Sequence, residues 1–134
     1  IETRFLRFGM VVQAYSDAHQ QATSASLLTA RDAVIAVSHT GATLELLDTV
    51  RTAREAGAAV IIITSHAHSP LAKLGDIVLH GMGREVHYSS EAVSSRLIHM
   101  AITDALYTVI AMQSPKEYRR NLQKMRAVIA KKRT

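Results

Sequence analysis

Apolar residues follow two patterns that alternate along the chain. Short runs rich in β-branched residues are separated by longer segments in which apolar residues recur every three or four positions. The runs are typical of strands and the longer segments of helices, so their alternation predicts βα units around a parallel sheet. The predicted strands are residues 10–15, 33–38, 59–64 and 76–80.

Capping residues mark the ends of the predicted helices. Asp17 is a good N-cap, and Gly57 is a good C-cap. Proline suits the first position of a helix, so Ser69-Pro70 and Ser114-Pro115 each predict a helix start. The predicted helices are residues 1–8 up to Gly9, 17–28, 43–56, a short helix from Ser69-Pro70, a long helix from Ser89 or Ser90 to about Met112, and a last, basic helix from Ser114-Pro115.

Two of the predicted strands, 33–38 and 59–64, are continuous apolar runs. Such runs are typical of strands buried on both faces, so we expect these two at the centre of the sheet. The predicted fold class is α/β, a three-layer αβα sandwich around a parallel, doubly wound (flavodoxin-like) sheet. With 134 residues, the chain has the size of one domain, and we expect residues 1–134 to form it.

Composition narrows the possible chemistry. The chain has no cysteine, so disulfides, thiolate catalysis and zinc-thiolate sites are excluded. No apolar run approaches the roughly 20 residues of a membrane-spanning helix. We therefore expect a cytoplasmic protein without a membrane partner.

The net charge of +5 is concentrated at one end of the chain. Eight Lys or Arg residues and one acid, Glu117, lie between Lys116 and Arg133, so the remainder is mildly acidic. A basic helix can contact DNA, but charge runs usually face water, and the sequence has no helix-turn-helix pattern. Apolar residues at helical spacing favour a role of this helix in subunit contacts instead. They are Leu122, Met125, Val128 and Ile129.

The first residues read as the last two turns of a helix, with no strand before them. In a βα protein, a helix is normally preceded by a strand and a loop. We therefore expect that a preceding strand and loop belong to the protein but not to this chain.

The densest group of polar residues is Ser38-His39-Thr40-Gly41-Ala42-Thr43, between a predicted strand and a predicted helix. Ligands of open parallel sheets bind beyond the carboxyl ends of strands, where helix N-termini present free amides. Three hydroxyls and a glycine at this place predict a neutral phosphate cradle, although the same residues could simply form a turn and a helix cap. The segment is neither a P-loop nor a dinucleotide fingerprint.

This loop resembles the S-x-S/T-G-x-T phosphate loop of SIS (sugar isomerase) domains. The resemblance extends over most of the chain and is strongest to the C-terminal domain of RpiR/MurR-type bacterial transcription regulators. It implies that Ser38, Thr40 and Thr43 hold a phosphate, with the backbone around His39 and Gly41 assisting. The matching segments are residues 32–41, 43–46, 53–58, 63–65, 69–72 and 74–76, where Gly75 replaces the more usual alanine.

Glu91 matches the position at which SIS isomerases place a carboxylate near the sugar. A carboxylate at a helix start can accept sugar hydroxyls or move a proton, but it is also an ordinary first-turn acid. SIS domains usually have a further sugar-binding loop after their first strand, and that segment is missing from this sequence.

Seven histidines, including His66 and His68, raise the question of a metal site. Two histidines at i, i+2 provide no complete ligand set, and no H-E-x-x-H motif occurs. We therefore expect no metal and no other cofactor, and no catalytic residues.

The resemblance implies that the chain is the phosphosugar-sensing effector domain of a transcription regulator. This domain would form a homodimer or tetramer, and ligand binding would alter DNA binding by an N-terminal helix-turn-helix domain that is absent from this sequence. The alternative is an aldose-ketose phosphosugar isomerase that uses Glu91 or a histidine. Isomerases of this type often have Gly-Glu-Thr in the loop, whereas this chain has Gly41-Ala42-Thr43. That departure favours the sensor. Neither the identity of the sugar nor the direction of regulation follows from the sequence.

Overall fold

The computed structural model describes residues 2–84 and 92–132. The chain divides into two compact units. Tyr15–Ile102 forms one, here called the sheet unit, and Ile1–Ala14 with Thr103–Thr134 forms the other, here called the aromatic unit.

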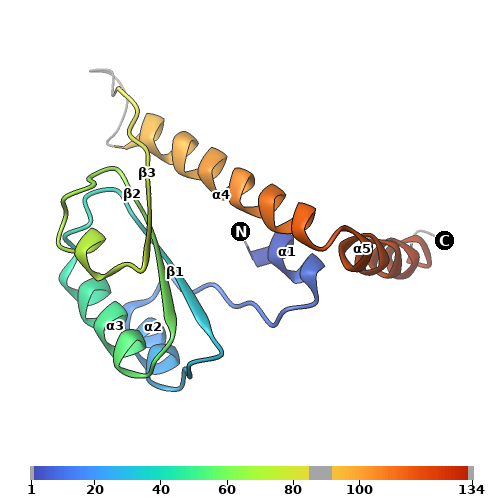
Figure 1. Cartoon of the computed structure of the whole chain (residues 1–134), viewed down its shortest axis with the longest axis horizontal. Helices are drawn as coiled ribbons and strands as arrows, with labels where there is room; N and C mark the ends of the chain where they lie inside the picture. The colour runs from blue at the N-terminus through green and yellow to red at the C-terminus, as the bar shows by residue number, and fades with distance from the viewer. Residues whose placement is uncertain (1, 85–91, 133–134) are drawn as a thin grey trace. The chain divides into compact units, whose positions relative to one another are not determined.

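The sheet unit is built on three parallel strands, β1 (Ala33–Ser38), β2 (Ala59–Thr64) and β3 (Ile77–His80), in the order β1-β2-β3. Figure 1 shows helices on both sides of this sheet, so the predicted α/β class with a parallel sheet flanked by helices is confirmed. All three predicted strand regions from residue 33 onward are confirmed. β2 is the middle strand, but β1 lies at an edge of the described sheet rather than at its centre.

The prediction of a strand at residues 10–15 is wrong. This segment has no regular secondary structure, and Met10 and Val11 are 51% and 94% exposed. Strands are stabilised by hydrogen bonds and side-chain packing across a neighbouring strand, which β-branched residues alone cannot supply. Among the described residues, no strand pairs with this segment.

Four helical segments accompany the sheet: α2 (Ala18–Ser26), α3 (Leu44–Glu55), the 3-10 turn η2 (Ala72–Leu74) and the first half of α4 (Val93–Gln113). Asp17 caps α2 as predicted, because its carboxylate accepts a hydrogen bond from the Gln20 amide at 2.9 Å. The short helix predicted from Ser69-Pro70 is present only as the 3-10 turn η2, which begins later, at Ala72. The predicted start of the long helix at Ser89 or Ser90 lies outside the described residues.

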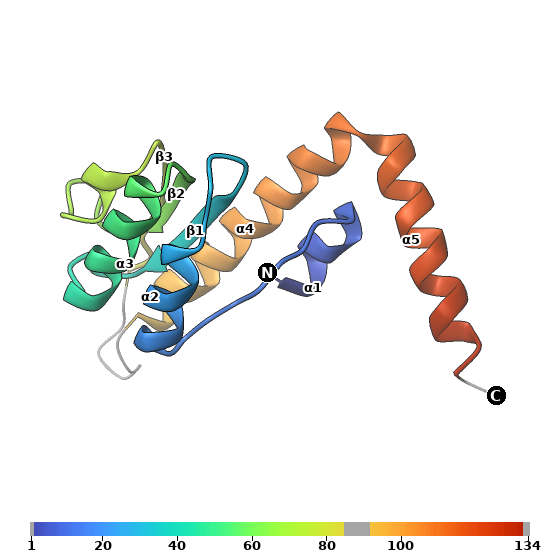
Figure 2. The same cartoon turned by 90° about the horizontal axis from the view of Figure 1, so that it is seen from below.

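The core of the sheet unit lies between β2 and α3. Val60 and Ile62 of β2 are fully buried and pack in one cluster with Leu47 and Val50 of α3. Figures 1 and 2 show α2 and α3 side by side next to the strands. Burial of such side chains contributes roughly 1.5–3 kcal/mol each, so the start of α3 is firmly held at the end of β1.

The aromatic unit joins the beginning and the end of the chain. It contains α1 (Glu2–Phe5), the 3-10 turn η1 (Leu6–Phe8), the second half of α4 and α5 (Pro115–Ala130). The Phe8 ring centroid lies 5.2 Å from that of Tyr107 and 5.8 Å from that of Tyr118.

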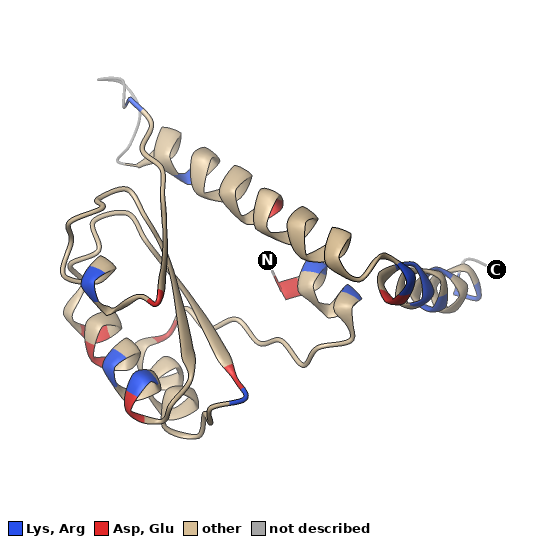
Figure 3. Ribbon diagram, viewed as in Figure 1, with Lys and Arg blue, Asp and Glu red and all other residues tan. Residues whose placement is uncertain are grey.

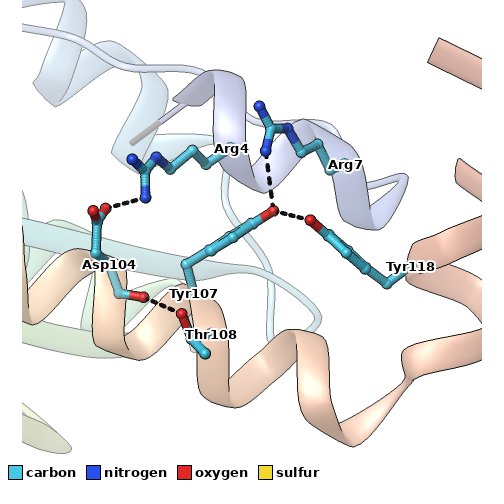
Figure 4. Close-up of polar contacts among 6 residues, drawn as sticks. All are labelled: Arg4, Arg7, Asp104, Tyr107, Thr108 and Tyr118. Atoms are coloured by element: carbon cyan, nitrogen blue, oxygen red, sulfur yellow. Dashed lines mark hydrogen bonds and ion pairs between the residues drawn. The ribbon is translucent and has the colours of Figure 1, made fainter. Parts of the chain in front are cut away.

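Hydrogen bonds and an ion pair also join residues of this unit (Figure 4). Arg7 Nη1 donates to Tyr107 Oη at 3.3 Å, and the Tyr107 and Tyr118 hydroxyls lie 2.6 Å apart. Arg4 forms an ion pair with Asp104. The hydrogen bond from Tyr107 lowers the pKa of Tyr118, whereas burial raises the pKa of Tyr107.

Helix α5 carries five Lys or Arg residues and one acid, Glu117, and Figure 3 shows it mostly in blue. Its apolar residues Val128 and Ile129 are 58% and 52% exposed. Within the described part of the chain, no helix has the length and apolar character needed to cross a bilayer.

Candidate functional site

The carboxyl ends of the three strands bring polar residues to one edge of the sheet. The parallel register aligns Ser38 with Thr64, and Thr64 with His80. Residues that are 42 positions apart in sequence therefore lie at the same level of the sheet, two strands apart. This is the edge at which open parallel sheets bind ligands.

The loop after β1, residues 38–43, here called the first loop, uses two of its hydroxyl oxygens to hold its own backbone. Ser38 Oγ accepts a hydrogen bond from the Gly41 amide at 3.0 Å, and Thr40 Oγ1 accepts one from the Ala42 amide at 3.4 Å. A hydroxyl that accepts a hydrogen bond still has its own hydrogen to donate. Both side chains can therefore keep the loop folded and donate to an anion at the same time.

Thr43 occupies the N-cap position of α3, yet its side chain makes no capping hydrogen bond. A threonine at this position ordinarily satisfies one of the free amides of the first helical turn. Here, the hydroxyl of Thr43 is exposed beside those amides. Hydroxyl and amides together form the neutral donor set that the sequence predicts for a phosphate oxygen.

Gly41 fixes the first loop against the loop after β2, residues 65–69, here called the second loop. Its φ is +64°, and a Cβ atom at this position would lie 2.2 Å from Ser69 Oγ. Its carbonyl accepts a hydrogen bond from the Leu71 amide at 2.9 Å. The site therefore requires glycine here, both for the backbone conformation and for the close approach of Ser69.

Histidines surround Ser65 in the second loop. Ser65 Oγ lies 2.9 Å from His39 Nδ1 and 3.0 Å from His99 Nε2, and the Ser65 carbonyl accepts from His80 Nε2 at 2.9 Å. His99 Nε2 also lies 3.2 Å from the Gly81 carbonyl oxygen. Ser65 thus connects the first loop, strand β3 and helix α4.

His99 is only 5% exposed. Burial lowers the pKa of His99 below its ordinary value, and the charges of His39 and His80, when these are protonated, act in the same direction. A hydrogen bond to the Gly81 carbonyl opposes this shift without cancelling it. The neutral ring of His99 therefore persists to lower pH in the folded protein than in the unfolded chain.

An open hollow of about 560 Å³ lies beside the first loop, which borders it only at Thr40. The hydroxyls of Ser38 and Thr43 are not part of its wall, so the phosphate cradle lies at its rim rather than inside it. The lining residues are Thr40, Ser65, His66, Ala67, His68, Ser69, Pro70, His80 and Met82.

His66 and His68, two possible metal ligands, line this hollow. Among the described residues, no three His, Asp or Glu side chains are arranged to hold a metal ion. The histidines near Ser65 instead form hydrogen bonds with protein groups.

Five of the six residues predicted for the site lie together on the first loop: Ser38, His39, Thr40, Gly41 and Thr43. The sixth, Glu91, lies outside the described residues. Sequence reasoning missed the grouping of His39, His80 and His99 around Ser65. The sequence did contain a signal for it, because β3 ends at His80 and β1 and β2 are followed within two positions by His39 and His66. Parallel strands bring these ends to the same edge of the sheet.

Comparison with known proteins adds to this geometry. The family model of the SIS domain matches residues 1–109. The chain belongs to the SIS domain family. Membership agrees with the phosphate-loop resemblance of residues 38–43 and with the parallel α/β fold of the sheet unit.

Regulators are among the relatives of this SIS domain. It is 35% identical over 129 residues to the HTH-type transcriptional regulator RpiR of Escherichia coli K12, covering 96% of this chain and 44% of RpiR. It is also 39% identical over 110 residues to the bifunctional protein glk of Paraburkholderia xenovorans, covering 82% of this chain and 17% of glk. The chain thus spans less than half the length of the regulator and about a sixth of glk.

A solved structure shares the fold of this SIS domain. The NanR protein of Vibrio vulnificus, complexed with ManNAc-6P, matches with a TM-score of 0.85 and 27% identity. The match covers 96% of this chain and 48% of NanR. The RpiR transcription factor sugar isomerase domain of Sphaerobacter thermophilus matches with a TM-score of 0.73 at 21% identity, which concerns the fold alone.

Proposed function

We propose that residues 1–134 form a single SIS domain that binds a sugar phosphate and serves as the effector domain of a transcription regulator. The observation that carries this proposal is the first loop, in which the hydroxyls of Ser38, Thr40 and Thr43 have hydrogens to donate beside the N-terminus of α3. The similarity to RpiR and to NanR supports the regulatory role and the ligand class.

The phosphate would be held without a cationic side chain from the first loop. Hydroxyl and amide donors contribute roughly 1.5–3 kcal/mol each when the acceptor is charged. The positive end of the α3 dipole favours an anion at the same place. His39 and Gly41 shape this cradle, and Glu91 is the proposed contact to the sugar.

Regulation would require partners outside this chain. DNA would be bound by a helix-turn-helix domain, and ligand binding would alter the packing of two or four subunits and hence the spacing of their DNA-binding domains. The exposed apolar residues of α5, such as Val128 and Ile129, are the proposed subunit contacts.

An isomerase is the second candidate, because the resemblance of residues 38–43 to the phosphate loop of SIS (sugar isomerase) domains is compatible with it. Aldose-ketose isomerisation needs a group that removes a proton from one carbon and returns it to the next. The first loop offers hydroxyls and a histidine but no carboxylate, and Gly41-Ala42-Thr43 lacks the acid that isomerases of this type often have. We therefore propose binding without turnover.

The test is a thermal-shift screen of the protein against a panel of sugar phosphates that includes ManNAc-6P. A ligand that binds only the folded state raises the free energy of unfolding by about 2.7 kcal/mol when its concentration is 100 times Kd. The melting temperature rises accordingly. We expect Ser38→Ala and Thr43→Ala to abolish the shift. Recovery of the ligand unchanged supports a sensor, turnover above background supports the isomerase, and no shift with any sugar phosphate would refute both.

A further inference from the structure

Two hydrogen bonds between side chains connect the first loop to helix α4. His39 Nδ1 contacts Ser65 Oγ at 2.9 Å, and Ser65 Oγ contacts His99 Nε2 at 3.0 Å. Ser65 is 1% exposed and His99 is 5% exposed, so water has little access to compete for the inner bond. All three residues belong to the sheet unit.

The Gly81 carbonyl favours one placement of the hydrogens in this chain of bonds. A carbonyl oxygen only accepts, so its distance of 3.2 Å from His99 Nε2 favours the ring form with the hydrogen on Nε2. That one hydrogen is then shared between the Gly81 carbonyl and Ser65 Oγ, and Ser65 donates its own hydrogen to His39 Nδ1. A neutral His39 in this arrangement carries its hydrogen on Nε2.

A second arrangement of the same hydrogens runs in the opposite direction. His39 would donate from Nδ1 to Ser65, Ser65 would donate to His99 Nε2, and His99 would carry its hydrogen on Nδ1. The lone pair of His99 Nε2 would then face the Gly81 carbonyl oxygen, so the first arrangement is favoured. Coupling between sites needs an element with two such states.

The first loop is positioned to act on this element. Ser38 and Thr40 are the neighbours of His39, so a ligand held by their hydroxyls engages the loop on both sides of it. The His39 carbonyl also accepts from the Ser65 amide at 3.2 Å and from Thr64 Oγ1 at 3.3 Å. Any adjustment of the loop around a ligand therefore changes the contact between His39 and Ser65.

We propose that Ser65 is a positioning residue that couples ligand binding at the first loop to helix α4, through His39 on one side and His99 on the other. The inference rests on the proposed phosphosugar site and adds a route by which its occupancy reaches the helix. Because coupling is reciprocal, a change at His99 must also alter ligand affinity.

The experiment is histidine-ring ¹⁵N NMR of the whole 134-residue chain, with inorganic phosphate and ManNAc-6P as probes. Without a probe, we expect both His39 and His99 to carry their hydrogen on Nε2. A bound probe should shift the backbone amide resonances of residues 38–43 and the ring resonances of His99. In Ser65→Ala, the loop amides should still shift, whereas the His99 response should be lost.

Two further variants complete the design. His39→Phe keeps a ring against His66, whose centroid lies 5.5 Å away, but removes the acceptor for Ser65, so the His99 response should again be lost. Thr49→Val removes a buried hydroxyl that, among the described residues, bonds to the Glu45 carbonyl alone, and it should retain the response. If Ser65→Ala fails to fold, His39→Phe carries the test from the half-buried end of the chain of bonds, provided that its loop amides still shift with the probe.

The outcomes separate this inference from the proposed function. A His99 response that persists in Ser65→Ala or His39→Phe overturns the coupling and leaves the phosphosugar site intact. Loop amides that shift in the wild-type protein with no change at His99 do the same. If neither probe shifts the loop amides of the wild-type protein, the proposed function and the coupling fall together.

Discussion

The first and second loops have similar compositions and opposite environments. Each follows a parallel strand, and each combines serine, histidine and alanine. In the first loop, Thr40 and Thr43 are exposed, whereas in the second loop Ser65 and Ser69 are 1% and 6% exposed. Hydroxyl content alone therefore does not identify a ligand site, and what distinguishes the two loops is which hydroxyls still have a hydrogen to donate to solvent or ligand.

The contact between the two loops gives the largest expected effect. In Gly41→Ala, the added Cβ must approach Ser69 Oγ while the backbone keeps a φ of +64°. Left-handed backbone and overpacking together cost about 2 to 4 kcal/mol. Urea denaturation should reveal this loss of stability, and phosphate binding should be lost with it.

Gly57→Ala is the matched control for that variant. Gly57 has a φ of +87°, but the nearest atom to its added Cβ is Ala30 Cβ at 3.5 Å, an ordinary contact. Only the backbone cost of about 1 to 2 kcal/mol remains. Equal losses in the two variants would show that the close packing of the loops contributes nothing.

Thr43→Val tests whether the exposed hydroxyls of the first loop bind a ligand. The side chain makes no capping bond, so the stability of the ligand-free protein should change little. Loss of one hydrogen bond to a charged ligand should weaken sugar phosphate binding roughly 10- to 100-fold, as measured by calorimetry. Thr52→Val, on the same helix, should bind as the wild type does, because its hydroxyl bonds to the Asp48 carbonyl. Undiminished binding by Thr43→Val would remove this residue from the site.

Ser69→Ala tests the opposite role of the second loop. Ser69 Oγ accepts a hydrogen bond from the Ala72 amide at 3.2 Å and is buried. Its removal should destabilise the protein by about 1 kcal/mol in thermal or chemical denaturation. The ligand-induced rise in melting temperature should remain, and a variant that is stable but no longer binds would reverse the roles assigned to the two loops.

The smallest expected effect is the dependence of stability on pH through His99. Because its pKa in the folded state is lowered from the ordinary 6.5, the unfolded chain takes up a proton at a pH where the folded chain does not. This contribution to stability is complete above about pH 6.5 and is lost as the pH falls toward the folded pKa. Melting temperatures measured from about pH 7.5 down to about pH 5.5 should decrease.

Glutamine variants assign this pH dependence to its source. His99→Gln should flatten the decrease, whereas His19→Gln, on the exposed side of α2, should leave it in place. An unchanged slope in His99→Gln would mean that other groups titrate in this range.

Local signals sufficed for much of the fold. Strands β1, β2 and β3, the Asp17 cap and the first loop follow from residues adjacent in sequence. The strand predicted at residues 10–15 failed because strand formation depends on a partner, which no local pattern encodes. The grouping of His39, Ser65 and His99 was missed because it depends on strand register and on the docking of α4, both set by distant contacts.

The aromatic unit has a consequence for the order of folding. The Arg7 to Tyr107 hydrogen bond joins residues 100 positions apart, whereas Tyr15–Ile102 is continuous in sequence. Contacts between distant residues form slowly, because the chain between them loses entropy when its ends meet. During synthesis, the sheet unit can therefore fold before Tyr107 and Tyr118 have left the ribosome. The contacts of Phe5 and Phe8 with these tyrosine rings form last.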